Sequence, residues 1–194
     1  MIKLILKLSI LLALPALAIS QAVTPPHPFS GAIVSVDGNT ISLQDKDGTS
    51  FTVQMTPGWT VSVVRKVDAD AIKPGSFVAT TNAPVTANAG RSTELRILEP
   101  GYRPEEGTHA VSPTDSNMMT HGTVKSVNKN EAGVELEVTY PGGSRMLLVP
   151  VTAPVTISDP LDKSVLKPGV AVGGVTRTGP DGVARASRVQ LSNK

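Results

Sequence analysis

The sequence predicts an all-β protein made of two small five-stranded barrels in tandem, each with one short helix between its third and fourth strands. Three observations support this prediction. Short segments in which apolar and polar residues alternate recur along the chain, separated by turns rich in glycine, proline and aspartate. A stretch that opens with an aspartate and ends in Lys-Pro-Gly occurs twice, at residues 68–75 and 159–169. Matching residues also recur at nearly constant spacing, as expected for a duplicated unit; they are Gly31 and Gly122, Gly75 and Gly169, and Arg96 and Arg188.

The chain begins with the features of a secretory signal peptide over residues 1–22. Lys3 and Lys7 come before a short apolar run, and small residues precede a cut after Ala22, with a cut after Ala18 as the alternative. The apolar run is too short to span a bilayer. We therefore expect bacterial export to the periplasm or the medium, with no membrane span after cleavage, and a mature chain whose residues 23–28 form a proline-rich tail.

The charge of the mature chain bears on its partners. Removing Lys3 and Lys7 with the leader leaves 16 basic and 16 acidic residues. A neutral chain argues against binding to nucleic acid or to an anionic membrane, since both depend on a basic surface. Residues 99–120 are mostly acidic among their charged residues, and residues 121–194 are mildly basic. The chain has no cysteine, so its stability must come from apolar cores rather than from disulfides.

The first barrel is expected over residues 29–98. Its short helix lies within residues 68–75, where Asp68 is the N-cap and Lys-Pro-Gly ends the helix. Residues 57–59, Pro-Gly-Trp, interrupt the third strand. The strands are predicted at residues 31–36, 40–44, 51–55 continued at 60–64, 76–81 and 93–98.

The second barrel is expected over residues 121–194 and repeats this order, with Asp159 as the helix cap. Between the barrels, residues 99–120 form a connector rich in proline, glycine and acidic residues. This connector is either a flexible linker or a segment that packs between the barrels through Tyr102, Met118 and Met119. The strands of the second barrel are predicted at residues 122–127, 134–140, 146–151 with 156–157, 170–175 and 184–191.

The first strand of each barrel carries two apolar residues three positions apart, Ile33 with Val36 and Val124 with Val127. A β-bulge would place both residues on the inner face and bend the strand, as a small closed barrel requires. Five strands with a helix between the third and the fourth is the order of an OB-fold. Each barrel is therefore expected to be OB-like.

Four residues near the end of the connector are the candidate metal ligands. Thioethers and imidazoles are soft or borderline ligands that suit copper, and a chain without thiols would have to use them for such a metal. Methionine at a contact between barrels is also an ordinary filler of gaps, so the alternative is a purely structural role. The candidate ligands are His109, Met118, Met119 and His121.

Aromatic residues define a second candidate site, a surface for a ligand or partner, at Trp59, Tyr102 and Tyr140. OB-folds bind single strands by stacking bases on exposed aromatic rings in a basic groove. The neutral charge weighs against this use, and Trp59 fits a position that covers a barrel end. No serine lies in a nucleophile-elbow motif with a paired histidine, and the aspartates fit turns and caps. We therefore expect a protein that is not an enzyme and has no cofactor, unless copper or another transition metal binds.

The repeated pattern resembles an exported bacterial OB-like β-barrel domain of unknown function, present here as a tandem pair. The resemblance covers nearly all of the mature chain. It implies a fold and a compartment, but no established activity. The residues that carry it are Gly31, Ile33, Val36, Ile72 to Gly75, Arg96 and Ile97 in the first half, and Gly122, Val124, Val127, Leu166 to Gly169, Arg188 and Val189 in the second.

The expected function is a non-enzymatic binding or structural module of the cell envelope, which contacts an envelope protein or a small ligand through the connector and the groove between the barrels. A periplasmic metal-binding or metal-handling protein is the first alternative. A polysaccharide-binding or single-strand nucleic-acid-binding OB-fold is the second.

Overall fold

The computed structural model describes residues 26–192. The predicted signal peptide, residues 1–22, and the start of the predicted tail lie outside the described residues. Within them the chain is all-β, and it includes no helix with the length and apolar character needed to cross a bilayer. The tail prediction is wrong for its last two residues, because His27 and Pro28 already pair with Thr176 and Val175.

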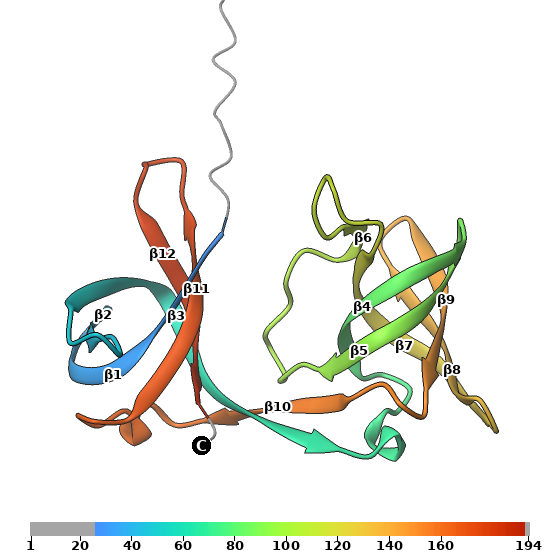
Figure 1. The fold of residues 1–194 in the computed structure, drawn as a ribbon, viewed down its shortest axis with the longest axis horizontal. Coiled ribbons are helices and arrows are strands. Elements are labelled where there is room, and N and C mark those ends of the chain that lie inside the picture. Colours follow the sequence, from blue (N-terminus) through green and yellow to red (C-terminus); the bar gives the residue numbers. More distant parts are fainter. Residues whose placement is uncertain (1–25, 193–194) are drawn as a thin grey trace, which may run out of the picture.

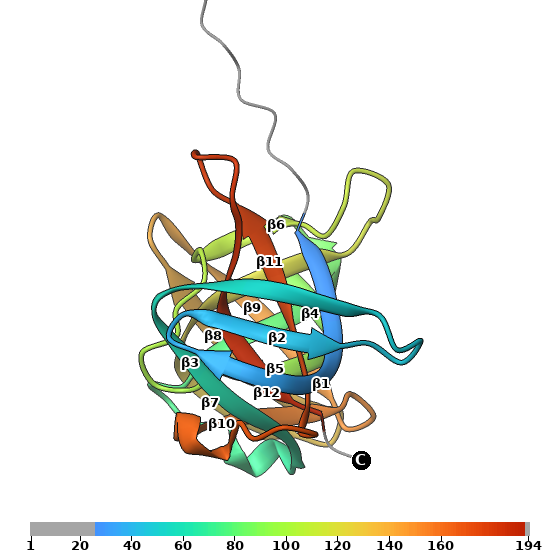
Figure 2. The same cartoon turned by 90° about the vertical axis from the view of Figure 1, so that its left-hand side faces the viewer.

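The strands close into two five-stranded barrels that lie side by side (Figure 1). Barrel 1 consists of β1 (His27–Asp37), β2 (Thr40–Gln44), β3 (Ser50–Val67), β11 (Ala171–Thr178) and β12 (Ala184–Leu191). It closes where β12 runs parallel to β3. Figure 2 views this barrel from its own side, with β1, β2 and β3 nearest the viewer.

Barrel 2 consists of β4 (Phe77–Thr86), β5 (Ala89–Ile97), β7 (Met118–Asn130), β8 (Gly133–Tyr140) and β9 (Gly143–Pro150). It closes where β5 runs parallel to β9. A short strand, β6 (Gly107–Ala110), pairs with the start of β7 and lies outside the closed ring.

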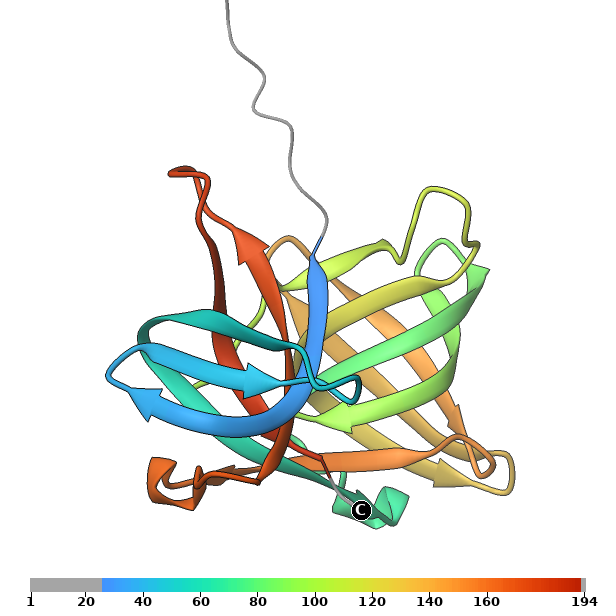
Figure 3. The same cartoon turned by 60° about the vertical axis from the view of Figure 1, so that its left-hand side comes forward.

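The two barrels exchange strands, which the order of the sequence did not predict. The strands β4 and β5 follow β3 in the chain but close barrel 2, and β11 and β12 follow β10 (Val155–Leu161) but close barrel 1. The chain crosses between the barrels twice, along the end of β3 and along β10, and these two segments pair antiparallel (Figure 3). The ranges 29–98 and 121–194 therefore do not correspond to the two closed barrels, since each barrel takes strands from both.

Each barrel has its own apolar core. The core of barrel 1 is formed by Ile41, Leu43, Val61, Val172 and Val189 with their neighbours, and that of barrel 2 by Val78, Leu95, Leu136, Val138 and Leu147 with theirs. Ile72 belongs to the core of barrel 2 and Leu166 to that of barrel 1. The segment after β3 thus packs into barrel 2, which β4 and β5 complete. The segment after β10 packs into barrel 1, which β11 and β12 complete.

The expected short helices are single 3₁₀ turns, η1 (Ala69–Ala71) and η2 (Lys163–Val165). The prediction for their caps was wrong in detail. Asp68 precedes η1 but makes no side-chain cap, and the residue that caps η2 is Asp162, which accepts a hydrogen bond from the amide of Ser164. Asp159 instead lies within β10 and forms an ion pair with Arg65 on β3.

Three other local predictions can be compared with the structure. The strand register shifts after Ile33 and after Val124, so the predicted bulges are present, although Val36 is 37% exposed rather than inward. β3 continues through Pro57 and Gly58, where an interruption was expected. The expected connector is not irregular throughout, because β6 and the start of β7 lie within it.

Candidate functional site

Three of the four predicted metal ligands share one face of the β6–β7 ladder. His109 lies directly opposite Met119 in this antiparallel pair, and His121 follows two residues later on the same strand. Since side chains alternate along a strand, His109, Met119 and His121 project from the same face, and Met118 projects from the other. The structure therefore separates Met118 from the other three residues.

The two histidine rings lie close together. Their centroids are 6.2 Å apart, and the rings are tilted by 50°. Gly107 lies opposite His121 in the ladder, and a Cβ atom at Gly107 would be 3.2 Å from Cε1 of His109. The ring of His109 thus lies over Gly107, the residue of its own strand that is opposite His121.

A backbone contact fixes the ring of His121. Its Nδ1 lies 3.0 Å from the carbonyl oxygen of Glu105, so this nitrogen is the donor and Nε2 is left free. Burial lowers the pKa of His121 below its ordinary value of 6.5, the hydrogen bond to Glu105 partly opposes this, and the charges of His109 and of Arg177 on β11 lower the pKa further. The imidazole therefore favours its neutral form, which is the form that binds metals. Among the described residues, no group of three side chains drawn from histidine, aspartate and glutamate could hold a metal ion.

The three predicted aromatic contact residues do not form one surface. Trp59 is 3% exposed in the core of barrel 1, where its Nε1 donates to Asn39 and Lys163 covers the ring at 4.0 Å. The hydroxyl of Tyr140 accepts a hydrogen bond from Thr108. Tyr102, in the connector, borders a cleft.

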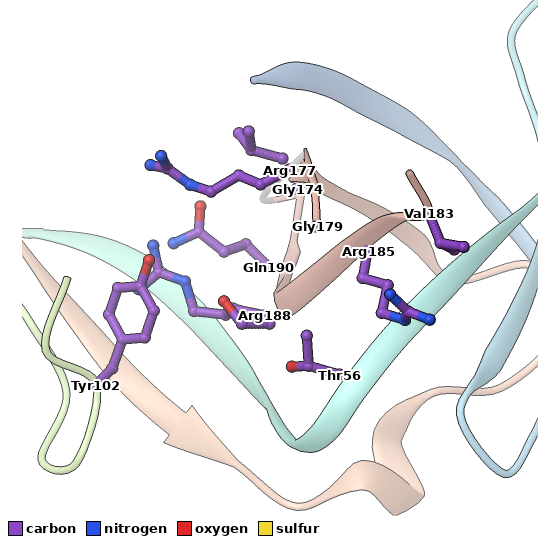
Figure 4. Close-up of a pocket in the computed structure, with 11 residues that line it drawn as sticks. Thr56, Tyr102, Gly174, Arg177, Gly179, Val183, Arg185, Arg188 and Gln190 are labelled. Atoms are coloured by element: carbon purple, nitrogen blue, oxygen red, sulfur yellow. The ribbon is translucent and has the colours of Figure 1, made fainter. Parts of the chain in front are cut away.

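This cleft lies between the connector and the β11–β12 hairpin and has a volume of about 310 Å³. Tyr102 forms one side, and Arg177, Arg185, Arg188 and Gln190 belong to the hairpin. Figure 4 shows Arg177, Gln190 and Arg188 reaching toward the side on which Tyr102 lies, with Arg185 on the other side. Three arginines of one hairpin thus line the cleft.

The three arginines differ in their partners. Arg188 donates to both carboxylate oxygens of Glu99, at 3.1 and 3.0 Å, and its guanidinium stacks on Tyr102 at 4.0 Å. Arg185 pairs with Asp181 at 2.7 Å. Within residues 26–192, the side chain of Arg177 makes no hydrogen bond or ion pair, although it lies directly opposite Arg185 in the ladder. Arg177 is thus an exposed cation for which the described residues supply no counterion, opposite an arginine whose own charge is paired with Asp181.

A second unpartnered donor lies in the same cleft. The Nε2 atom of Gln190 is buried and has no hydrogen-bond acceptor in the structure. Leaving a buried donor unpaired costs about 1–3 kcal/mol. An acceptor from a ligand or from water would remove this cost.

Sequence reasoning missed Arg177 and Gln190. Arg188 was noted only as a residue that matches Arg96, and the mildly basic charge of residues 121–194 was the one available signal. That signal did not reveal which basic residues lack an acidic partner, because Arg185 and Arg188 are as basic in sequence as Arg177 but are neutralised in space.

Comparison of the chain with protein families, with curated proteins and with solved structures finds no match. The resemblance to an exported OB-like domain of unknown function gains no support from these comparisons and stays an expectation.

Proposed function

We propose that this protein is a non-catalytic binding module of the cell envelope that holds an anionic group, a carboxylate or a phosphate, in the cleft between the connector and the β11–β12 hairpin. The observation that carries the proposal is a pair of donors without acceptors in one cleft, the guanidinium of Arg177 and the buried Nε2 of Gln190. An anion that accepts from both would neutralise the first and satisfy the second.

The surroundings of these donors support a preformed site. Glu99, whose side chain is 1% exposed, holds Arg188 in place with two hydrogen bonds. Arg188 in turn stacks on Tyr102, which closes one side of the cleft. Side chains fixed in this way lose little conformational entropy when a ligand binds.

Two broader parts of the proposal rest on other features. We propose that both barrels are OB-like and arose from one duplicated unit. The supports are the equal strand number of the barrels, a parallel closure in each between the third strand of one half of the chain and the fifth strand of the other half, and one 3₁₀ turn at the matching place. Location in the cell envelope rests on the signal-peptide features of residues 1–22.

The aromatic residues do not favour base stacking as a second function. That alternative needs exposed aromatic rings along a groove, whereas Trp59 is buried and Tyr102 is covered by Arg188. Polymers that carry carboxylates, such as acidic polysaccharides, remain ligands of the proposed chemistry and form one arm of the test.

The proposal is tested by isothermal titration calorimetry on the mature protein at low salt. The probes are inorganic phosphate, glucuronate and an oligomer of galacturonate, which separate a free phosphate, a single sugar acid and an acidic polysaccharide. We expect saturable binding of at least one probe that weakens as salt rises. Arg177→Gln should reduce the affinity by about tenfold or more, since it removes a charge-assisted hydrogen bond.

Arg91→Gln is the matched control. Arg91 lies on β5, is exposed, and like Arg177 has no side-chain ion pair within the described part of the chain. The control should bind like the wild type, and Gln190→Leu should bind more weakly. Absence of binding to all three probes, or equal losses in Arg177→Gln and Arg91→Gln, would contradict the proposal.

A further inference from the structure

We infer that His109, Met119 and His121 form a binding site for Cu(I) on the β6–β7 ladder. The three ligands are not residues of the anion cleft, although the charge of Arg177 in that cleft acts on His121. The inference rests on three independent features of these residues: their shared face, the placement of the two rings, and the chemistry of the donors.

The shared face comes from the strand register. His109 and Met119 are direct neighbours across the ladder, and His121 is the next residue on the same face of β7. Cross-strand neighbours have Cβ atoms about 5 Å apart, and a diagonal neighbour is still within reach of a long side chain. Two regular strands thus present three donors together without any loop having to fold around the metal.

The ring positions favour a common ion. The ring centroids are 6.2 Å apart, and a ring nitrogen lies about 2 Å from a bound metal, so the two imidazoles can reach one ion by small rotations. The carbonyl oxygen of Glu105, which contacts Nδ1 of His121, holds that ring and leaves Nε2 for the metal. Metal-binding histidines commonly have such a partner on their second nitrogen, and it orients the ring.

The donor set favours copper in its lower oxidation state. Two imidazoles and one thioether suit Cu(I), whereas zinc sites are built from cysteine, histidine and carboxylates. Arg177 lies near enough to act on His121 electrostatically, and its positive charge opposes a divalent ion more than a monovalent one. The side chain of Glu105 has the opposite influence on His121 and partly offsets this repulsion.

The chain contains a matched pair of methionines for the test. Met119 projects from the face of the histidines, and Met118 projects from the opposite face. Met119→Leu and Met118→Leu change the same chemical group on neighbouring residues with similar volume. The affinity for Cu(I) is measured on the mature protein under reducing conditions, in competition with a chromophoric Cu(I) chelator.

We expect one Cu(I) per chain. Met119→Leu and His109→Asn should each weaken binding by about tenfold or more, while Met118→Leu stays within about twofold of the wild type. X-ray absorption at the copper edge should show nitrogen and sulfur neighbours, with the sulfur lost in Met119→Leu only. Equal losses in the two methionine variants, no binding in competition with the chelator, or equal affinity for Zn(II) would overturn the inference.

Discussion

Arg145 is a charged residue that is buried in barrel 2. It is 4% exposed inside barrel 2, and its guanidinium donates to Oδ1 of Asn82 and to the carbonyl oxygens of Ala87 and Ala89. Asn82 in turn donates to Thr120. These acceptors are neutral, so the hydrogen bonds have to compensate for burying the charge. Arg145 thereby ties β9 to the hairpin that joins β4 and β5.

We therefore expect Arg145→Leu to lower the free energy of unfolding by about 2–4 kcal/mol, because it leaves buried acceptors without donors. Urea unfolding followed by circular dichroism measures the change. Arg91→Leu, on the exposed face of β5, is the control and should change stability by less than about 0.5 kcal/mol. An equal effect of the two substitutions would show that the interior hydrogen bonds of Arg145 contribute little.

The candidate sites show what can be foreseen for single residues. The sequence singled out His109, Met118, Met119 and His121 as candidate ligands by their side-chain chemistry, and the structure places three of them on one face and Met118 on the other. Arg177 could not be found in this way, since its significance is the lack of a partner, which depends on where Asp181 and Glu99 lie in space. Trp59 was a candidate contact residue but is buried, because the sequence does not distinguish a large aromatic residue of a core from one on a ligand surface.

At the scale of elements, the ion pair between Glu99 and Arg188 holds the connector to barrel 1. Glu99 follows β5 of barrel 2, and its partner Arg188 lies on β12 of barrel 1. The side chains are 1% and 14% exposed, so water screens the pair weakly. Tyr102 packs on the same guanidinium. The pair therefore positions the segment that forms one side of the anion cleft.

Glu99→Leu should lower the free energy of unfolding by about 3–5 kcal/mol, because it leaves the charge of Arg188 without its acid. The double variant Glu99→Leu with Arg188→Met should recover most of the loss, since no unpaired charge remains and methionine packs well against the ring of Tyr102. Urea unfolding of both single variants and the double variant completes the cycle. Additive losses would contradict a direct coupling between the two residues.

The alternation of apolar residues predicted most of the strands, because a strand buried on one face must alternate. β6 was not predicted, since its four residues, Gly-Thr-His-Ala, have no apolar alternation and pair only with one edge of β7. β3 was divided at Pro57 and Gly58, yet the strand continues through them, and Gly58 adopts a positive φ of 76° there. Proline and glycine thus mark a distortion of this strand rather than its end.

At the scale of the whole molecule, the exchange of strands could not be predicted from the pattern of the sequence. In both halves the fourth and fifth strands follow a crossing strand and a 3₁₀ turn, so a closed five-stranded barrel could be completed from either half. What distinguishes the two arrangements is the path of β3 and β10. Both strands are paired with each other between the barrels, from Val61 opposite Leu161 to Val67 opposite Val155. Turning back into one barrel would break this ladder.

The exchange makes a prediction that the absence of cysteine allows to be tested cleanly. Ala32 on β1 lies opposite Ala171 on β11, although they come from different halves of the chain. Ala32→Cys with Ala171→Cys should form an intramolecular disulfide on mild oxidation, because cross-strand neighbours lie within the reach of such a bond. Ser30→Cys with Ala79→Cys is the control, since these positions would be neighbours only if β4 completed barrel 1. The bond is detected by the mass of the intact chain and by faster migration on a non-reducing gel. A disulfide in the control pair and none in the first would mean that each barrel is built from consecutive strands. In that arrangement the anion cleft would lose the contact between Glu99 and Arg188 that shapes it.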